Sequence, residues 1–63
     1  ERERIANLES RITDLEEQMT QMEIEMSDPD TYADSARAQS LSKRYAALQD
    51  KVAALYEEWE AAQ

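Results

Sequence analysis

The sequence contains no cysteine, no histidine and no glycine, and it has a single proline. Without Cys and His the chain has no disulfide, no thiol nucleophile, no imidazole base and none of the common zinc ligand sets. Without Gly it has no glycine-rich loop to hold a phosphate group. Because histidine is absent, the Ser and Thr hydroxyls have no His base to activate them. We predict that this chain is not an enzyme and has no catalytic residue, no cofactor site and no metal site.

Long apolar runs are also missing. The longest, Val52 to Tyr56, is far shorter than the roughly 18 residues of a membrane-spanning helix. Seven Lys and Arg stand against fifteen Asp and Glu, and the net charge of -8 favours solubility and repels phosphate backbones at long range. These features predict a soluble, cytoplasmic protein with no membrane partner, and they disfavour a general nucleic-acid binder.

Two runs of helical sequence make up most of the chain. Apolar side chains recur at alternating steps of three and four residues, the spacing of a coiled-coil seam. In the first run they are Ile5, Leu8, Ile12, Leu15, Met19, Met22 and Met26, and in the second Ala38, Leu41, Tyr45, Leu48, Val52, Leu55, Trp59 and Ala62. We predict an all-α chain with helices over about 2–26 and 35–62. It forms one unit over 1–63, cut from a longer protein.

The segment 27–34 separates the two runs and is predicted to be the tip of a hairpin. Pro29 disfavours helical backbone at Asp28 and cannot donate a backbone hydrogen bond, so the first helix ends here. Asp28 is expected to cap a single turn and Asp34 the second long helix. We expect Tyr32 to fold under the tip and close the seam; the alternative is an exposed recognition tyrosine.

Two seams joined by a short loop are predicted to pair as a monomeric, antiparallel coiled-coil hairpin. The register that we favour pairs Leu8 with Trp59, Leu15 with Val52 and Met22 with Tyr45; a second register slides the pairing by one heptad. The favoured one places Arg11 beside Glu58 and Glu25 beside Arg44. The structural seam residues of this prediction are Leu8, Leu15, Met22, Leu48, Val52, Leu55 and Trp59. Trp59 is expected to pack there or, alternatively, to dock on the rest of a larger protein.

The acidic residues of the tip have partly the spacing of a calcium loop. Asp28, Asp30 and Asp34 occupy its first, third and seventh places, but Ala33 replaces the required Gly and Gln39 stands where a bidentate Glu belongs. We interpret these carboxylates as helix caps.

Basic residues repeat every seven positions in the second run, at Arg37, Arg44 and Lys51, with Lys43 beside Arg44. The ordinary interpretation is a solvated face that pairs with acidic flanking residues. The alternative is a strip that contacts nucleic-acid phosphates, which would bind weakly in the isolated domain.

The sequence resembles the C-terminal coiled-coil domain of ABC-F ATPases, the Uup-like soluble proteins with two ATP-binding cassettes. The resemblance covers essentially the whole chain and rests on three segments: IANLESRITDLE at 5–16, DPDTYAD at 28–34 and LYEEWE at 55–60. It implies an accessory domain at the C-terminal end of a protein that binds ATP and Mg²⁺ elsewhere. The partners implied are DNA, ribosomal RNA or the ribosome, and the parent's ATPase cassettes.

This sequence departs from that family at Ser35, where relatives often have proline, and its basic residues form no fixed motif. Two other interpretations stay open. The segment 27–45 also resembles the N-terminal helical region of peptide chain release factors. The heptads alone are compatible with a structural spacer or an oligomerisation module.

Overall fold

The computed structural model describes residues 2–63, and these are helical almost throughout. Helix α1 spans Arg2–Met26, α2 spans Pro29–Ala33 and α3 spans Ser35–Ala62, with lengths of 25, 5 and 28 residues. None of residues 2–63 lies in a strand. The predicted all-α class is confirmed; each long helix begins three residues before the first seam residue of its heptad pattern and ends at the last one.

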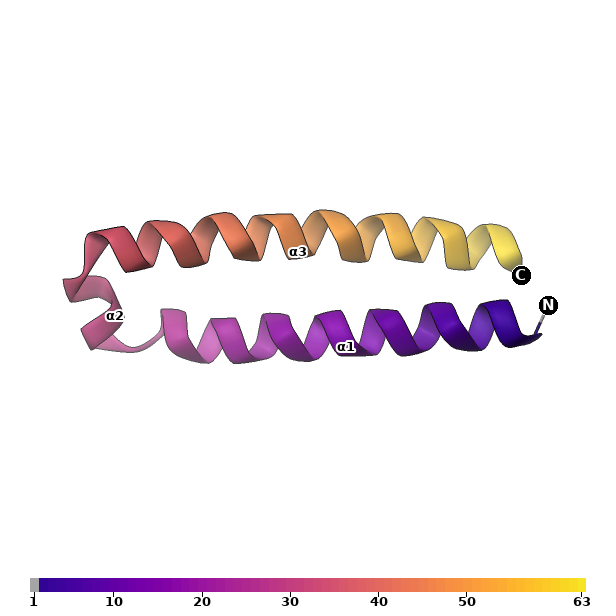
Figure 1. Cartoon of the computed structure of the whole chain (residues 1–63), viewed down its shortest axis with the longest axis horizontal. Coiled ribbons are helices and arrows are strands. Elements are labelled where there is room, and N and C mark those ends of the chain that lie inside the picture. Colours follow the sequence, from indigo (N-terminus) through magenta and orange to yellow (C-terminus); the bar gives the residue numbers. More distant parts are fainter. Residues whose placement is uncertain (1) are drawn as a thin grey trace.

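The two long helices lie side by side, and the chain reverses direction through α2 (Figure 1). The start of α1 and the end of α3 lie at the end of the molecule opposite α2, which we call the open end. The extents of 47 × 14 × 11 Å describe a rod that is as wide as two packed helices. Such a shape leaves most side chains in contact with water.

The apolar stripes of α1 and α3 face each other and form a narrow core. Its buried hydrophobic residues are Leu8, Ile12, Met22, Leu41, Val52 and Leu55. At the open end Leu8, Ile12 and Leu55 form a cluster, and Leu15, Trp59 and Ala62 pack against it. Two helices cannot enclose a side chain on all sides, and none of the described side chains is completely buried. The core is therefore thin, as expected for so small a unit.

The tip is built by two aspartate caps. Asp28 follows α1 and is the N-cap of α2, where its Oδ1 accepts a hydrogen bond from the backbone N–H of Asp30 at 2.9 Å. Asp34 Oδ1 accepts one from the backbone N–H of Arg37 at 3.1 Å and caps α3. Pro29 occupies the first turn of α2, where its missing N–H costs nothing. Both predicted caps are confirmed, and these two carboxylates are occupied as cap acceptors.

The prediction that Tyr32 closes the seam is wrong. Its side chain is 68% exposed, whereas the neighbouring Thr31 is only 3% exposed. Neighbouring residues of a helix point about 100° apart, and in α2 it is Thr31 that faces the long helices while Tyr32 faces water. The smaller side chain lies inside, and the tyrosine, whose hydroxyl is readily hydrated, lies outside. Tyr32 is instead exposed, as the alternative interpretation expected.

Replacing the second cap should destabilise the start of α3. We expect Asp34→Ala to lower the free energy of unfolding by about 1 kcal/mol, because the N–H of Arg37 loses its acceptor. Urea denaturation followed by circular dichroism measures this. Asp30→Ala removes an exposed tip carboxylate with no side-chain cap role and should change stability by less than about 0.5 kcal/mol. Equal losses would contradict the capping role.

Candidate interaction surfaces

One side of the helix pair carries a row of hydrogen bonds between glutamates and aromatic residues, which we call the carboxylate flank. Tyr45 Oη donates to Glu23 Oε2 at 2.5 Å, and Tyr56 Oη donates to Glu16 Oε2 at 2.8 Å. Nearer the open end, Trp59 Nε1 donates to Glu9 Oε2 at 3.1 Å. Three polar aromatic side chains of α3 are thus tied to α1 along most of its length.

The spacing of three glutamates in the sequence indicates this row of hydrogen bonds, but no such row was predicted. Glu9, Glu16 and Glu23 are seven residues apart and each directly follows a seam residue, so all three lie on one side of α1. Tyr45 and Trp59 were expected to pack in the seam, and these hydrogen bonds give them a second role. Tyr56 and Trp59 also contact each other edge to face, with ring centroids 6.4 Å apart.

The hydrogen bonds of this flank change the acidity of two phenols. The carboxylate of Glu23 raises the pKa of Tyr45, chiefly by accepting the phenol's hydrogen bond, with partial burial and the glutamate's negative charge acting in the same direction. Glu16 raises the pKa of Tyr56 for the same reasons. Each phenol is therefore held in its neutral, hydrogen-bond-donating form.

This shift predicts a loss of stability at alkaline pH. Because the pKa of both phenols is higher in the folded chain, their contribution is fully present below the ordinary tyrosine value of about 10. It is lost as pH rises through the raised values. Circular dichroism should show helicity falling over this range, and less so for the double variant Tyr45→Phe, Tyr56→Phe. Tyr32→Phe is the matched control; an equal effect there would contradict a role for the flank.

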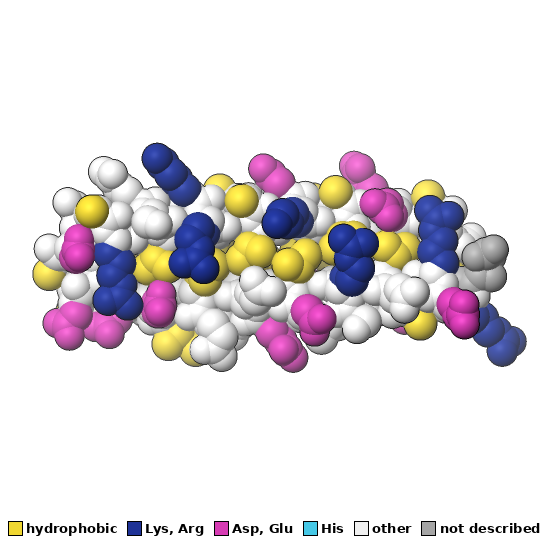
Figure 2. Space-filling model, in the orientation of Figure 1, with side chains coloured by type: hydrophobic (Ala, Val, Ile, Leu, Met, Phe, Trp, Pro, Cys, Tyr) yellow, Lys and Arg dark blue, Asp and Glu magenta, His cyan; other side chains and the backbone are white. Residues whose placement is uncertain are grey.

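The opposite side of the helix pair carries most of the basic residues, and we call it the basic flank. Its eight members flank the seam at heptad spacing: Arg4, Arg11, Gln18 and Glu25 on α1, and Arg37, Arg44, Lys51 and Glu58 on α3. Five of the chain's seven cationic side chains are in this set. Figure 2 shows a face on which Lys and Arg side chains run along the molecule with hydrophobic side chains between them.

The predicted nucleic-acid residues fall on or beside this flank. Arg44 and Lys51 line hollows between the helices. Lys43 precedes Arg44 and so lies about 100° further around α3, on its outward side. Glu25 was expected to pair with Arg44, and this expectation is wrong, because the Glu25 carboxylate pairs with Arg37 instead, whose Nη2 lies 3.7 Å from Glu25 Oε1. Several long, solvated side chains lie near Glu25, and exposed pairs differ by only a few tenths of a kcal/mol.

Arg4 and Arg11 of α1 also belong to this flank, although the repeat of Arg37, Arg44 and Lys51 in α3 did not predict them. Arg11 lines one hollow together with Lys51 and another together with Arg4. The seven-residue spacing of Arg4 and Arg11 is evident in the sequence. Whether they lie on the same side of the seam as Arg44 and Lys51 depends on how the two helices pair. The basic flank is therefore built by both helices rather than by α3 alone.

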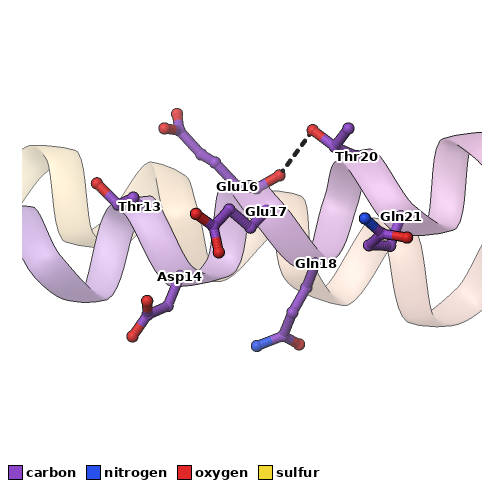
Figure 3. A pocket seen from close by; sticks show the side chains of 7 residues that line it. All are labelled: Thr13, Asp14, Glu16, Glu17, Gln18, Thr20 and Gln21. Atoms are coloured by element: carbon purple, nitrogen blue, oxygen red, sulfur yellow. Dashed lines mark hydrogen bonds between the residues drawn. The ribbon is translucent and has the colours of Figure 1, made fainter.

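The outer face of α1 has a shallow hollow, but nothing there resembles an active site. Figure 3 shows Asp14 and Gln18 extending to one side of the helix and Glu16 and Thr20 to the other. Thr20 Oγ1 donates to the backbone oxygen of Glu16 at 3.0 Å. Carboxylates that diverge on a solvated helix cannot share a substrate. Among residues 2–63, no group of three or more acidic side chains is placed to bind a metal ion.

The described helices include none with a stretch long and apolar enough to traverse a lipid bilayer. The surfaces of residues 2–63 are thus a capped tip, a carboxylate flank and a basic flank, carried on a pair of long helices. These residues form a small all-α domain.

The comparison with protein families agrees with this description. The family model described as ABC transporter C-terminal domain matches residues 1–63, and the chain belongs to this family. The resemblance stated from the sequence is confirmed, and the match favours it over the release-factor region. Searches of curated proteins and of solved structures gave no match.

Proposed function

We propose that this chain is a non-catalytic accessory interaction domain of an ABC-F ATP-binding protein, and that it works as an antiparallel coiled-coil hairpin. The family match supports the C-terminal accessory role. The reversal of the chain at α2 and the contacts of α1 with α3 support the hairpin. The contacts of Trp59 with the Leu8 cluster and with Glu9 support the favoured register.

ATP and Mg²⁺ belong to the ATPase cassettes of the proposed parent protein. This chain has no glycine, so it supplies no phosphate-binding loop, and we derive no step of ATP hydrolysis from its residues. The cassettes are its first partners, and such a protein acts in the cytoplasm. Light scattering should give a monomer for the isolated chain; a stable dimer would support the spacer or oligomerisation interpretation instead.

The proposed second partner is the phosphate backbone of DNA or ribosomal RNA. The observation that carries this proposal is the gathering of five cations on one flank of a chain whose net charge is -8. The remaining faces repel phosphates, so contact is restricted to this flank. Nothing on it resembles a helix that reads base edges in a groove, and we therefore expect no sequence preference.

Titration of labelled duplex DNA and of a ribosomal RNA hairpin tests this proposal. With three or four phosphate contacts, the slope of log affinity against log salt should be about -3. The variant Arg37→Gln, Lys43→Gln, Arg44→Gln should bind at least tenfold more weakly.

A matched control introduces the same charge change away from the tested cations, as Thr13→Glu, Gln49→Glu, Ala53→Glu. It should keep most of the affinity, because these exposed positions lie away from the basic flank. Equal binding by all three proteins, or no binding by the wild type at low salt, would contradict nucleic-acid contact. The hairpin would then act through its protein partners.

A further inference from the structure

The three tyrosines of the chain differ in what their hydroxyl groups contact. Tyr45 and Tyr56 lie within α3, and their hydroxyls donate hydrogen bonds to Glu23 and Glu16 of α1. Tyr32 lies in α2 and is 68% exposed. Within the part of the chain that the structure describes, its hydroxyl has no hydrogen-bond partner. Two phenols are thus engaged in the fold, and the third is presented to water.

The place of Tyr32 in the fold makes it accessible to an enzyme. Helix α2 has only five residues and lies at one end of the molecule, where the chain turns from α1 into α3 (Figure 1). So short a helix has little stability of its own, and the tip can open locally while the long helices stay paired. Tyr45 and Tyr56 lie inside a helix of 28 residues. An enzyme would have to break their hydrogen bonds to α1 before it could use their hydroxyls.

The surroundings of Tyr32 in the sequence are acidic. Asp28 and Asp30 precede it and Asp34 follows it, and the segment 27–34 contains no Lys or Arg. All three aspartates are exposed, including the two that act as helix caps. An enzyme that binds this tip must therefore present a cationic surface to it.

We propose that Tyr32 is a phosphorylation site, which accepts the γ-phosphoryl group of ATP from a protein-tyrosine kinase with a cationic substrate-binding surface. In the transfer, Oη of Tyr32 forms a bond to the γ-phosphorus, and the bond between that phosphorus and the β,γ-bridging oxygen breaks. ADP leaves with the electron pair of the broken bond, and the phenolic proton passes to the catalytic aspartate of the kinase and then to water. The kinase binds the ATP, so this chain supplies only the acceptor. The proposal does not depend on contact with nucleic acid.

The product would carry a phosphate with a charge of about -2 at neutral pH. Because Tyr32 faces water, the phosphate does not enter the seam. Arg37, the first cation after the tip in the sequence, is already paired with Glu25. The phosphate is therefore presented to solvent, where the arginines of a partner protein can bind it. Phosphorylation changes what the tip binds rather than how the helices pack.

The test uses the 63-residue chain, Mg²⁺, ATP and the purified catalytic domain of a protein-tyrosine kinase that accepts acidic substrates. Mass spectrometry of the intact chain and of its fragments should show a single phosphoryl group, on Tyr32. Tyr32→Phe should lower the initial rate of phosphorylation about tenfold or more. The double variant Tyr45→Phe, Tyr56→Phe should change it less than about twofold, because those hydroxyls are engaged with α1. Circular dichroism checks that each variant remains helical.

Two exposed aspartates supply matched variants for the charge argument. Asp30→Lys reverses a charge beside Tyr32 and should slow phosphorylation about fivefold or more, because the cationic surface of the kinase is then repelled. Asp50→Lys makes the same charge change on α3, away from the tip, and should alter the rate less than about twofold.

A synthetic peptide of residues 25–39 is the unfolded reference for these rates. Phosphorylation of the peptide but not of the chain would show that α2 shields the tyrosine, and it would overturn the proposal. So would phosphorylation of neither, or modification of Tyr45 or Tyr56 in the folded chain as fast as that of Tyr32. Equal effects of Asp30→Lys and Asp50→Lys would reject the cationic kinase surface on which the proposal rests.

Discussion

Replacing Leu55 with alanine is expected to unfold much of the chain at room temperature. Leu55 is 4% exposed and belongs to the cluster at the open end together with Leu8 and Ile12. Loss of a buried leucine side chain costs about 3 kcal/mol. A unit of this size has a free energy of unfolding of only about 3 to 5 kcal/mol. Urea denaturation followed by circular dichroism should therefore show a transition that begins at or near zero denaturant.

Leu48→Ala is the matched control for this result. Leu48 also lies on the seam of α3 but is only half-buried, so its loss should cost about 1 to 2 kcal/mol. The midpoint of denaturation should move less than for Leu55→Ala. If both variants lose the same stability, the open-end cluster is not the centre of the core.

Trp59→Ala should have an effect of similar size, with a loss of about 2 to 4 kcal/mol. The indole packs against the Leu8, Ile12 and Leu55 cluster and donates its N–H to Glu9. Trp59→Phe keeps most of the packing and removes the donor, so its loss should be closer to 1 kcal/mol. Thermal denaturation of the three proteins separates the two contributions.

Tyr32→Ala removes the aromatic ring at the other end of the molecule. Because that ring is exposed, its removal should change the free energy of unfolding by less than about 0.5 kcal/mol. A loss as large as that of Trp59→Ala would show that the tyrosine closes the tip after all. The pair of aromatic deletions thus compares the two ends of the helix pair directly.

The helices and their caps were predictable because local chemistry determines them. Apolar residues at alternating steps of three and four determine which face of each helix forms the seam. Pro29 determines where the first helix ends. Asp28 and Asp34 each precede a helix start and have the side chain that best satisfies a free N–H there. No long-range contact is needed for any of these predictions.

The tip and the flanks were less predictable, because they depend on how the elements meet. Whether Thr31 or Tyr32 faces inward follows from the rotation of a single-turn helix, which its sequence does not determine. The ion pair of Glu25 depended on choosing between Arg37 and Arg44, which lie seven residues apart on the same side of α3. Predicting the hydrogen-bond partners of Glu9 and Glu16 would have required the relative position of the two long helices. When a charged side chain has several possible partners of nearly equal energy, a single sequence does not indicate which ion pair forms.

The contact between Trp59 and Glu9 gives the protein an optical probe of its own. Trp59 is the one tryptophan of the sequence, and its indole bridges the two long helices beside the ring of Tyr56. Separation of the helices at the open end would break the hydrogen bond to Glu9 and move the indole into water. Its emission would shift to longer wavelength. Opening of the helix pair, or its closure on a partner, can thus be followed by fluorescence without any label.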